Sequence, residues 1–374
     1  MKHLTEYRDA DLVENLLQQL RKVTTKPWNI MEVCGGQTHG LVKHGILEML
    51  PDGITMIHGP GCPVCVTPVS HIDQAIELAL EKNVILCSYG DMLRVPGSGI
   101  SLLQARAKGA DIRIMYSPLE AVTVARENPD REVVFFAVGF ETTAPANALS
   151  VVQAKKAGLK NYSILSAHVL VPPAIEAIML DEETRVNGFL AAGHVCTVMG
   201  LSEYYPLVET YKIPVVVTGF EPVDLLEGIL MVVKQLEKGE YRLENQYKRV
   251  VWPDGNRQAV DLIHSVFEHR DREWRGIGSI PASGLFLRDE YRDYDAHVRF
   301  GPALASWASL APSAETVECL SGDVMKGKIK PVECPHFGTA CTPEHPVGAP
   351  MVSSEGACAA YYHFSSQNHY QEPK

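Results

Sequence analysis

Short apolar runs alternate with amphipathic segments between residues 9 and 239 of the chain. The segment Asp9–Val23 carries leucines at helical spacing among polar residues, which predicts an amphipathic helix packed on a domain surface. Apolar runs at 28–33, 84–87 and 132–138 are typical of strands, and each precedes a glycine-containing turn and a helical segment. The nearly continuous run at 132–138 is typical of a strand buried on both faces. Strands that alternate with helices predict βαβ units and therefore a parallel sheet.

The pattern changes after Gly239. The segment Arg257–His269 is predicted to be helical, and Gly276–Leu287 is predicted to be a strand with a glycine-rich bend. From Gly301 onward the periodicity fades, and Pro, Gly and Cys dominate, as in a small loop-rich module held together by metal. We therefore predict an α/β fold with two βαβ-type parallel-sheet domains followed by a loop-rich C-terminal module. The expected domains are residues 1–125, 126–250 and 251–374.

Reactive side chains gather at the predicted carboxyl ends of these strands, where open parallel sheets bind their ligands. The sequence Gly-Phe-Glu occurs at 139–141 and again at 219–221, each time after a Val-rich strand and before a helix. We interpret these two sequences, and the similarly placed His168 and His194, as corresponding corners of one sheet. The candidate residues at such ends are Cys34, Cys62, Cys65, Asp91, Glu141, His168, His194 and Glu221.

Composition and charge exclude several classes of protein. The 374 residues are 46% hydrophobic and 21% charged, which is ordinary for globular domains. The net charge of −11 argues against nucleic acid as a partner, because binding it requires a basic face. No apolar run is long enough to span a bilayer, and the polar N-terminus lacks the apolar core of a signal peptide. We therefore expect a cytoplasmic protein, whose nine cysteines need a reason other than structural disulfides.

Two thiol sites lie in the first 65 residues. Cys34 precedes two glycines and starts a predicted helix, where backbone N–H groups favour a thiolate that is nucleophilic and binds metal. The alternative is an inert buried cysteine, which would not require the two glycines. Cys62 and Cys65 stand in the loop His58–Pro68, which is stiffened by prolines and opened by glycines. A redox-active dithiol is favoured there over half of a zinc site or a chance spacing.

Four further cysteines are separated by fourteen, six and sixteen residues: Cys319, Cys334, Cys341 and Cys358. These gaps fit neither common zinc fingers nor the compact ferredoxin motif. Four thiols in a loop-rich segment still indicate a metal, either as a [4Fe–4S] cluster or as zinc, and spacing alone does not separate the two.

Other candidates at strand ends have a structural alternative. Glu141 and Glu221 could act as acids or bases, or could cap the helices that follow them. His168 and His194 could be ligands or hydrogen-bonded core residues. No P-loop, dinucleotide fingerprint or nucleophile elbow is present, so nucleotide-binding and hydrolase functions lack a motif.

Four motifs together resemble the HypD family of [NiFe]-hydrogenase maturation factors. They are Met31–His39, the His58–Pro68 loop, Gly139–Thr143 and Ser353–Cys358, and the resemblance covers essentially the whole chain. One departure is Ile329, at a position where some family members carry a further cysteine. The resemblance implies two α/β domains and a C-terminal iron–sulfur module, with a [4Fe–4S] cluster held by Cys319, Cys334, Cys341 and Cys358.

The resemblance also implies a function and partners. The chain would act with a small HypC-type chaperone as a redox-active scaffold on which the Fe(CN)2CO unit is built. A HypE-type donor would deliver cyanide, Cys34 would hold the Fe(II), and Cys62 and Cys65 would be a redox pair between cluster and iron. Outside that complex we expect a monomer. The family motifs add further candidate catalytic residues with less defined roles: His39, Asp91, Glu141, Ser354 and Glu355.

Two other functions are consistent with the same residues. A stand-alone ferredoxin-linked thiol-disulfide reductase would use the cluster and the Cys62–Cys65 pair, but would not need Cys34 in its glycine setting. A zinc-stabilised binding protein would do no redox work. Iron content separates them, because cluster iron alone indicates the reductase and one additional low-spin iron indicates the scaffold.

Overall fold

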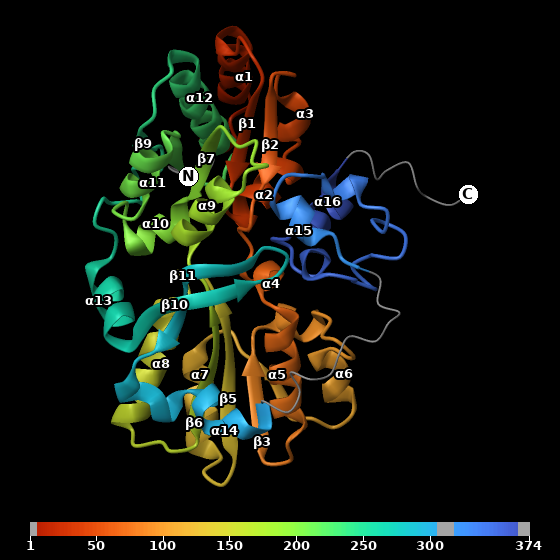
Figure 1. Ribbon diagram of the computed structural model, residues 1–374, viewed down its shortest axis with the longest axis vertical. Helices are drawn as coiled ribbons and strands as arrows, with labels where there is room; N and C mark the ends of the chain where they lie inside the picture. Colours follow the sequence, from red (N-terminus) through yellow and green to blue (C-terminus); the bar gives the residue numbers. More distant parts are fainter. Residues whose placement is uncertain (1–5, 305–317, 366–374) are drawn as a thin grey trace.

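The predicted α/β architecture is confirmed by the computed structural model, which describes residues 6–304 and 318–365. Two parallel sheets lie one above the other (Figure 1). Sheet A contains β1 (Trp28–Glu32), β2 (Ile54–His58), β7 (Gly188–Ala192), β8 (Val215–Thr218) and β9 (Leu243–Asn245). Sheet B contains β3 (Val84–Ser88), β4 (Ile112–Ile114), β5 (Glu132–Gly139) and β6 (Tyr162–His168).

Both sheets have the same doubly wound strand order. Sheet A runs β2-β1-β7-β8-β9 and sheet B runs β4-β3-β5-β6, so each places its second strand on one side of its first and the rest on the other. Such an order creates a switch point for ligands, here between β1 and β7 in sheet A and between β3 and β5 in sheet B. The expected boundary at residue 125 does not separate the sheets, because each sheet takes strands from both sides of it.

The two Gly-Phe-Glu sequences belong to different sheets, so their interpretation as corners of one sheet is wrong. The first ends β5 in sheet B, and the second follows β8 in sheet A. Likewise, His168 closes β6 in sheet B, and His194 follows β7 in sheet A. The connection from β6 to β7 crosses between the sheets, and a short local motif carries no information about such long-range pairing.

Helices cover both faces of each sheet. On sheet A, one face is covered by α1 (Ala10–Val23), α2 (Gly35–Lys43) and α12 (Pro222–Lys238), and the other by α9 (Val171–Leu180), α10 (Gly193–Met199) and α11 (Tyr204–Tyr211). On sheet B, one face is covered by α7 (Pro118–Glu127), α8 (Ala144–Lys156) and α13 (Arg257–Val266), and the other by α5 (Val69–Leu80) and α6 (Leu102–Ala107).

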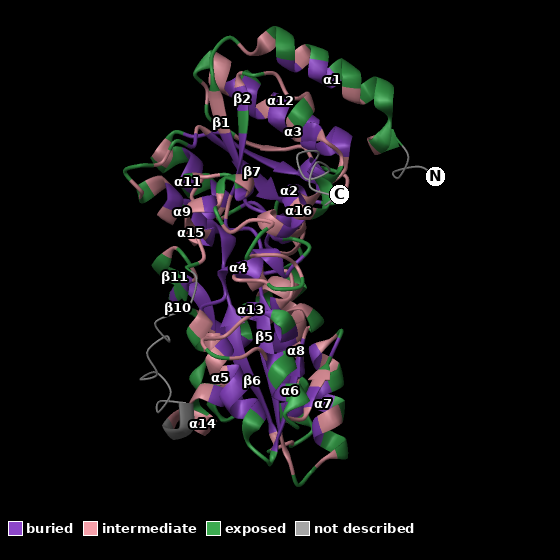
Figure 2. Ribbon diagram, turned by 90° about the vertical axis from the view of Figure 1, so that its right-hand side faces the viewer, coloured by how far each residue is buried: buried purple, intermediate pink, exposed green. Residues whose placement is uncertain are grey.

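Strand β5 lies between these layers and confirms the strand predicted to be buried on both faces. Val133 and Phe135 pack in the cluster with α7 and α8, whereas Val134 and Phe136 pack in the cluster with α5 and α6. The sheets form the buried interior of both halves of the molecule (Figure 2). Within the two described ranges, no helix has the length and apolar character that crossing a membrane requires.

A β-hairpin replaces part of a predicted helix. Helix α13 ends at Val266, and β10 (Phe267–Trp274) then pairs antiparallel with β11 (Gly278–Leu287). The helix prediction is wrong beyond Val266 because β10 leaves most of its polar side chains exposed and shows little apolar alternation. The described C-terminal segment forms short elements between loops, namely α15 (Ser321–Met325), η4 (Pro331–Glu333), η5 (Ala349–Met351) and α16 (Ala357–Phe364).

The carboxyl ends of the two sheets face one another. Cys34 and Cys62, which follow β1 and β2, share a hydrophobic cluster with Phe140 and Val169, which follow β5 and β6. Helix α4 (Pro63–Val66) lies between the sheets, beside the hairpin (Figures 1 and 2). Loops that follow strands of both sheets therefore meet in the middle of the molecule.

The loop after β2 packs backbone against backbone on the end of β1. The N–H of Gly59 donates to the carbonyl of Glu32 at 2.8 Å, and the N–H of Gly35 donates to the carbonyl of Gly61 at 2.8 Å. A Cβ on Gly61 would overlap the backbone nitrogen of Cys34. Glycine at position 61 is thus what lets the two loops approach so closely.

We expect Gly61→Ala to destabilise the fold by about 3 kcal/mol or more, because the added methyl group meets backbone atoms that cannot move aside. Thermal unfolding of the purified variant measures the loss. Gly99→Ala is the matched control, since Gly99 is exposed and a Cβ there has no neighbour within 4 Å. Equal melting temperatures for the two variants would contradict the close packing.

Candidate functional site

Cys34 lies at the switch point of sheet A. It follows β1, occupies the N-cap position of α2 and is fully buried. Its Sγ lies 3.5 Å from Nδ1 of His194, which enters from the start of α10 after the neighbouring strand β7. Burial lowers the pKa of His194 to about 4, so its imidazole is neutral at physiological pH and keeps a lone pair for a proton or a metal.

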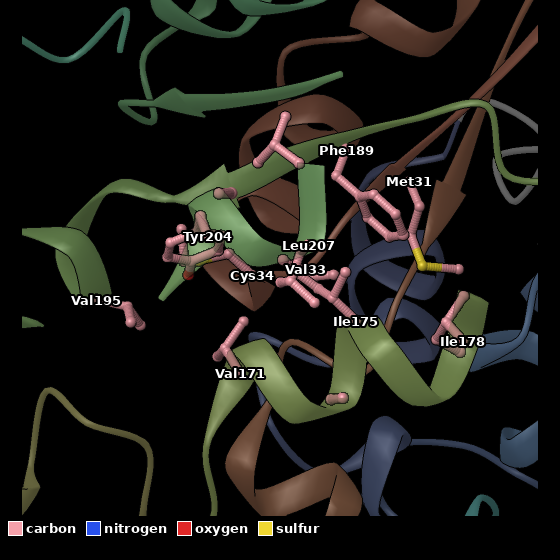
Figure 3. Packing of buried hydrophobic residues seen from close by; sticks show 14 of the residues in the cluster. Met31, Val33, Cys34, Val171, Ile175, Ile178, Phe189, Val195, Tyr204 and Leu207 are labelled. Carbon is pink, nitrogen blue, oxygen red and sulfur yellow. The ribbon is translucent and has the colours of Figure 1, made fainter. Parts of the chain in front are cut away.

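The Cys34 thiol is protonated in the absence of a metal. Backbone N–H groups of Gly36 and Gln37 lower its pKa, as the sequence predicts for a helix start, but burial outweighs them and raises the pKa far above its usual value. The carboxylates of Glu32 and Glu355 raise it further. Figure 3 shows the apolar side of this corner, where Cys34 and Val33 lie among side chains of the surrounding helices: Val171, Ile175, Tyr204 and Leu207.

The buried carboxylate of Glu32 holds the Cys34 corner in place through hydrogen bonds. Oε2 of Glu32 accepts the N–H of Cys34 at 2.9 Å, and Oε1 accepts the hydroxyl of Thr38. The same Oε1 lies 2.8 Å from Nδ1 of His58, whose Nε2 lies 3.0 Å from the hydroxyl of Tyr361 on α16. Burial raises the pKa of Glu32, and its bonds to His58 and Thr38 oppose that shift. The network joins β1, the end of β2 and the C-terminal segment.

Cys62 and Cys65 form a disulfide next to this corner. Cys62 caps the start of α4, and its Cα lies 5.2 Å from that of Cys65. Both cysteines line a small pocket, here called the disulfide pocket, together with Gly35 and Glu355. The residue directly after Cys34 therefore borders the same space as the disulfide.

The four C-terminal cysteines converge on one cavity, here called the four-cysteine cavity. A Cβ on Gly348 would overlap the sulfur of Cys319, and the N–H of Val347 donates to the sulfur of Cys341 at 3.4 Å. Burial raises the pKa of Cys358, and the other three thiols of the cavity raise it further, as expected for clustered sulfurs. No three His, Cys, Asp or Glu side chains among the described residues are arranged to hold a single metal ion.

The two sulfur sites are neighbours. Val324 and Pro350 line both the disulfide pocket and the four-cysteine cavity, so one layer of side chains separates the two spaces. At the start of α16, Ala357 borders the disulfide pocket and the adjacent Cys358 borders the four-cysteine cavity. The Cys62–Cys65 pair and the four C-terminal cysteines, which are remote in the sequence, are therefore neighbours in space.

The comparison with known proteins places the chain in a family. Residues 11–365 match the model of the HypD family, described as the hydrogenase formation hypA family. The chain belongs to the HypD family. It is 48% identical to the hydrogenase maturation factor HypD of Rhodobacter capsulatus over 372 residues, which are 97% of this chain and 98% of that relative. It is also 43% identical to HypD of Escherichia coli over 375 residues, or 98% of this chain and 99% of that one.

Several residues of the HypD motifs lie around the same centre. Nδ1 of His39 lies 3.1 Å from the carbonyl oxygen of Ser354, which places α2 against the C-terminal segment. Glu355 borders the disulfide pocket, and desolvation and the charge of Asp91 raise its pKa. Asp91 pairs with Arg94, whose guanidinium also donates to the carbonyl of Val352 at 3.0 Å. The corner after β3 thus contacts the segment that carries Glu355.

Three other candidates have different surroundings. Oε1 of Glu141 accepts the N–H of Val171 at 2.8 Å, and burial raises the pKa of Glu141 to about 8. Nε2 of His168 lies 3.2 Å from the Thr143 hydroxyl and 3.2 Å from the Asn147 amide, inside sheet B. Glu221 is the N-cap residue of α12 and pairs with Arg8 at the surface. These contacts favour the structural alternative for His168 and Glu221.

Sequence reasoning missed Glu32, His58 and Tyr361, although two of them carry a signal. Glu32 is a lone charge within an apolar strand, and His58 is the first residue of the glycine-rich loop that carries the cysteine pair. Tyr361 has no such mark, because its role follows from the docking of α16 against β2.

The raised pKa of Glu141 predicts a pH-dependent difference between the parent and Glu141→Gln. Above the ordinary pKa of 4.5 the unfolded state loses the proton, whereas the folded state keeps it until about pH 8, so parental stability falls as pH rises between these values. The variant lacks this titration, so its stability relative to the parent should increase from pH 4.5 to 8. Urea unfolding at several pH values measures it, with exposed Glu209→Gln as control. A pH-independent difference would contradict the assignment.

Proposed function

We propose that this HypD-family chain is a redox-active scaffold for hydrogenase maturation. It acts with a small HypC-type chaperone while the Fe(CN)2CO unit is assembled from cyanide supplied by a HypE-type donor. The main support is that the Cys34 corner, the disulfide pocket and the four-cysteine cavity follow one another in space. Gly35, the residue after Cys34, lines the disulfide pocket, and Val324 and Pro350 line both that pocket and the four-cysteine cavity. The relatives in Rhodobacter capsulatus and Escherichia coli are named hydrogenase maturation factors, which agrees with this role.

Cys34 is the proposed ligand of the iron under assembly. Cyanide and carbon monoxide are strong-field ligands of low-spin Fe(II), and a soft thiolate suits such an iron. The raised pKa of the free thiol means that iron binding must displace a proton. The neutral imidazole of His194 lies 3.5 Å from the Cys34 sulfur. It is therefore placed to accept this proton or to contact the iron.

The four-cysteine cavity fits a [4Fe–4S] cluster as the resident cofactor. Gly348 leaves room beside Cys319, and the Val347 N–H points at the sulfur of Cys341, as amide donors do around iron–sulfur clusters. A mononuclear zinc centre, with Zn–S bonds of about 2.3 Å, would require the sulfurs to converge on one ion. When bound, the cluster would supply single electrons at the wall shared with the disulfide pocket.

The number of electrons that the reaction requires supports a role for the disulfide. Release of cyanide from a thiocyanate breaks a sulfur–carbon bond and takes two electrons. Oxidation of the Cys62 and Cys65 thiols to their disulfide gives up two electrons and two protons, which leaves a thiol on the donor and hydrogen cyanide. Two single electrons and two protons would then restore the dithiol, and a cluster held in the four-cysteine cavity would supply the electrons across Val324 and Pro350, which line both spaces.

The stand-alone reductase is not favoured. Such an enzyme would use the disulfide and the cluster, but it would leave the Cys34 corner without a function. Glu32, His194 and Gly61 each contact Cys34, so these three residues are arranged around it.

We expect Cys34→Ala to abolish the cyanide and carbon monoxide infrared bands of the anaerobically purified complex with the HypC-type chaperone, because the variant lacks the iron-binding thiolate. The visible absorbance of the four-cysteine site should stay at the parental level. Cys87→Ala is the matched control, because Cys87 is equally buried but lies in β3 of the other sheet. Unchanged bands in Cys34→Ala would refute the iron role.

We expect Cys62→Ala to keep its cluster iron and sulfide but to reduce the cyanide bands by at least about tenfold, because one thiol alone cannot give up two electrons as an intramolecular disulfide. Iron analysis and infrared spectra of the same preparation measure both quantities. Cys196→Ala, which removes another buried thiol near sheet A, controls for nonspecific damage. Normal cyanide incorporation by Cys62→Ala would exclude the relay.

A further inference from the structure

The C-terminal segment holds the Cys34 corner at two points, one before Cys34 in the sequence and one after it. Before it, the carboxylate of Glu32 accepts the backbone N–H of Cys34 at 2.9 Å, and further hydrogen bonds link this carboxylate to α16. After it, Gly35 lies against Glu355, because a Cβ on Gly35 would come within 2.5 Å of the Glu355 carbonyl oxygen. The position of Cys34 therefore depends on a part of the chain that is remote in sequence.

The link from α16 to Cys34 is a buried path of hydrogen bonds. The hydroxyl of Tyr361 lies 3.0 Å from Nε2 of His58, and Nδ1 of His58 lies 2.8 Å from Oε1 of Glu32. The other oxygen of this carboxylate, Oε2, accepts the N–H of Cys34. The exposed fractions of Glu32, His58 and Tyr361 are 0%, 5% and 7%, so water does not readily replace a partner that is lost.

The hydrogen-bond path begins on a helix that also carries a residue of the four-cysteine cavity. Cys358 borders that cavity and lies three residues before Tyr361 on α16, which is close to one helical turn. The ring of Tyr361 packs edge-on against His58, with ring centroids 5.4 Å apart, and shares a small hydrophobic cluster with Val42 of α2. The docking of α16 therefore determines where the Tyr361 hydroxyl stands.

We propose that Tyr361 is a positioning residue for Cys34. Its hydroxyl holds His58 and, through Glu32, keeps the Cys34 corner in the geometry that binds iron. The inference rests on the iron role of Cys34 proposed above. Without the hydroxyl, Nε2 of His58 is buried without a partner, so His58 and Glu32 gain alternative positions. The apparent affinity for iron then falls in proportion to the fraction of molecules in which the site is formed.

Three variants separate the hydrogen-bond path from general stability. Tyr361→Phe removes the hydroxyl and keeps the ring that packs against His58. The matched control is Tyr162→Phe, which removes a buried hydroxyl that donates to Ser150 at 2.8 Å on the other sheet. His58→Phe breaks the middle of the path by removing both ring nitrogens, and it leaves α16 and its hydroxyl unaltered.

The decisive measurement is hydrogen exchange at the Cys34 amide, followed by mass spectrometry of the complete chain with its cluster and without the iron under assembly. We expect Tyr361→Phe to exchange this amide at least about tenfold faster, which is the factor expected for one lost hydrogen bond in a buried, charged path. Exchange in β5 should stay at the parental rate, which a general loss of stability would not allow. Tyr162→Phe should keep the parental rate at Cys34. When iron is limiting, the cyanide and carbon monoxide bands of the Tyr361→Phe complex should fall by about the same factor.

Parental exchange at Cys34 in a Tyr361→Phe protein with full cluster iron would overturn the inference, and so would an equal acceleration in β5. If Tyr361→Phe fails to retain the cluster, His58→Phe decides by the same measurement. Faster exchange at Cys34 but not in β5 then supports the path, and parental exchange at Cys34 overturns it. A parent complex without cyanide and carbon monoxide bands would instead refute the proposed function. Because exchange is measured without that iron, the two failures stay apart.

Discussion

A single buried carboxylate, that of Glu32, joins three parts of the chain that are far apart in sequence. It accepts the backbone N–H of Cys34, and through His58 it reaches Tyr361 on α16. Burying a carboxylate costs several kcal/mol unless its oxygens are paired, so the carboxylate and its partners depend on one another. The position of Cys34, the start of the disulfide loop and the docking of the C-terminal segment are therefore one coupled arrangement.

The doubly wound order of both sheets explains why so many reactive residues meet. A parallel sheet delivers its strand ends, and the loops that follow them, to one edge. In this molecule the two edges face each other, so the Cys34 and Cys62 loops of sheet A meet the loop after β5 of sheet B. By contacting this one region, the C-terminal segment reaches elements from both sheets. Its Val352 carbonyl accepts from Arg94, which follows a strand of sheet B, and its Ser354 carbonyl lies next to His39, which follows a strand of sheet A.

Local sequence patterns predicted the local features of this structure, namely its strand ends and turns. The strand–turn–helix pattern placed Cys34 and the cysteine pair at strand ends, and close packing of glycine 61 on Cys34 explains why this loop is rich in glycine. The distribution of strands between sheets could not be predicted, because the crossover from β6 to β7 leaves no local mark.

The side chains that line both sulfur sites are apolar. Val324 and Pro350, which line both spaces, carry no titratable group and therefore offer no route for protons. Under the proposed function, every two-electron cycle of Cys62 and Cys65 also needs two protons, which must enter from another side. Glu355 also borders the disulfide pocket, and desolvation together with the charge of Asp91 raises its pKa above the usual value, so under the proposed function it is the candidate donor of these protons. Under the proposed function, the HypD motif that contains Glu355 and Cys358 would supply a proton donor to the disulfide pocket and a cluster ligand to the four-cysteine cavity.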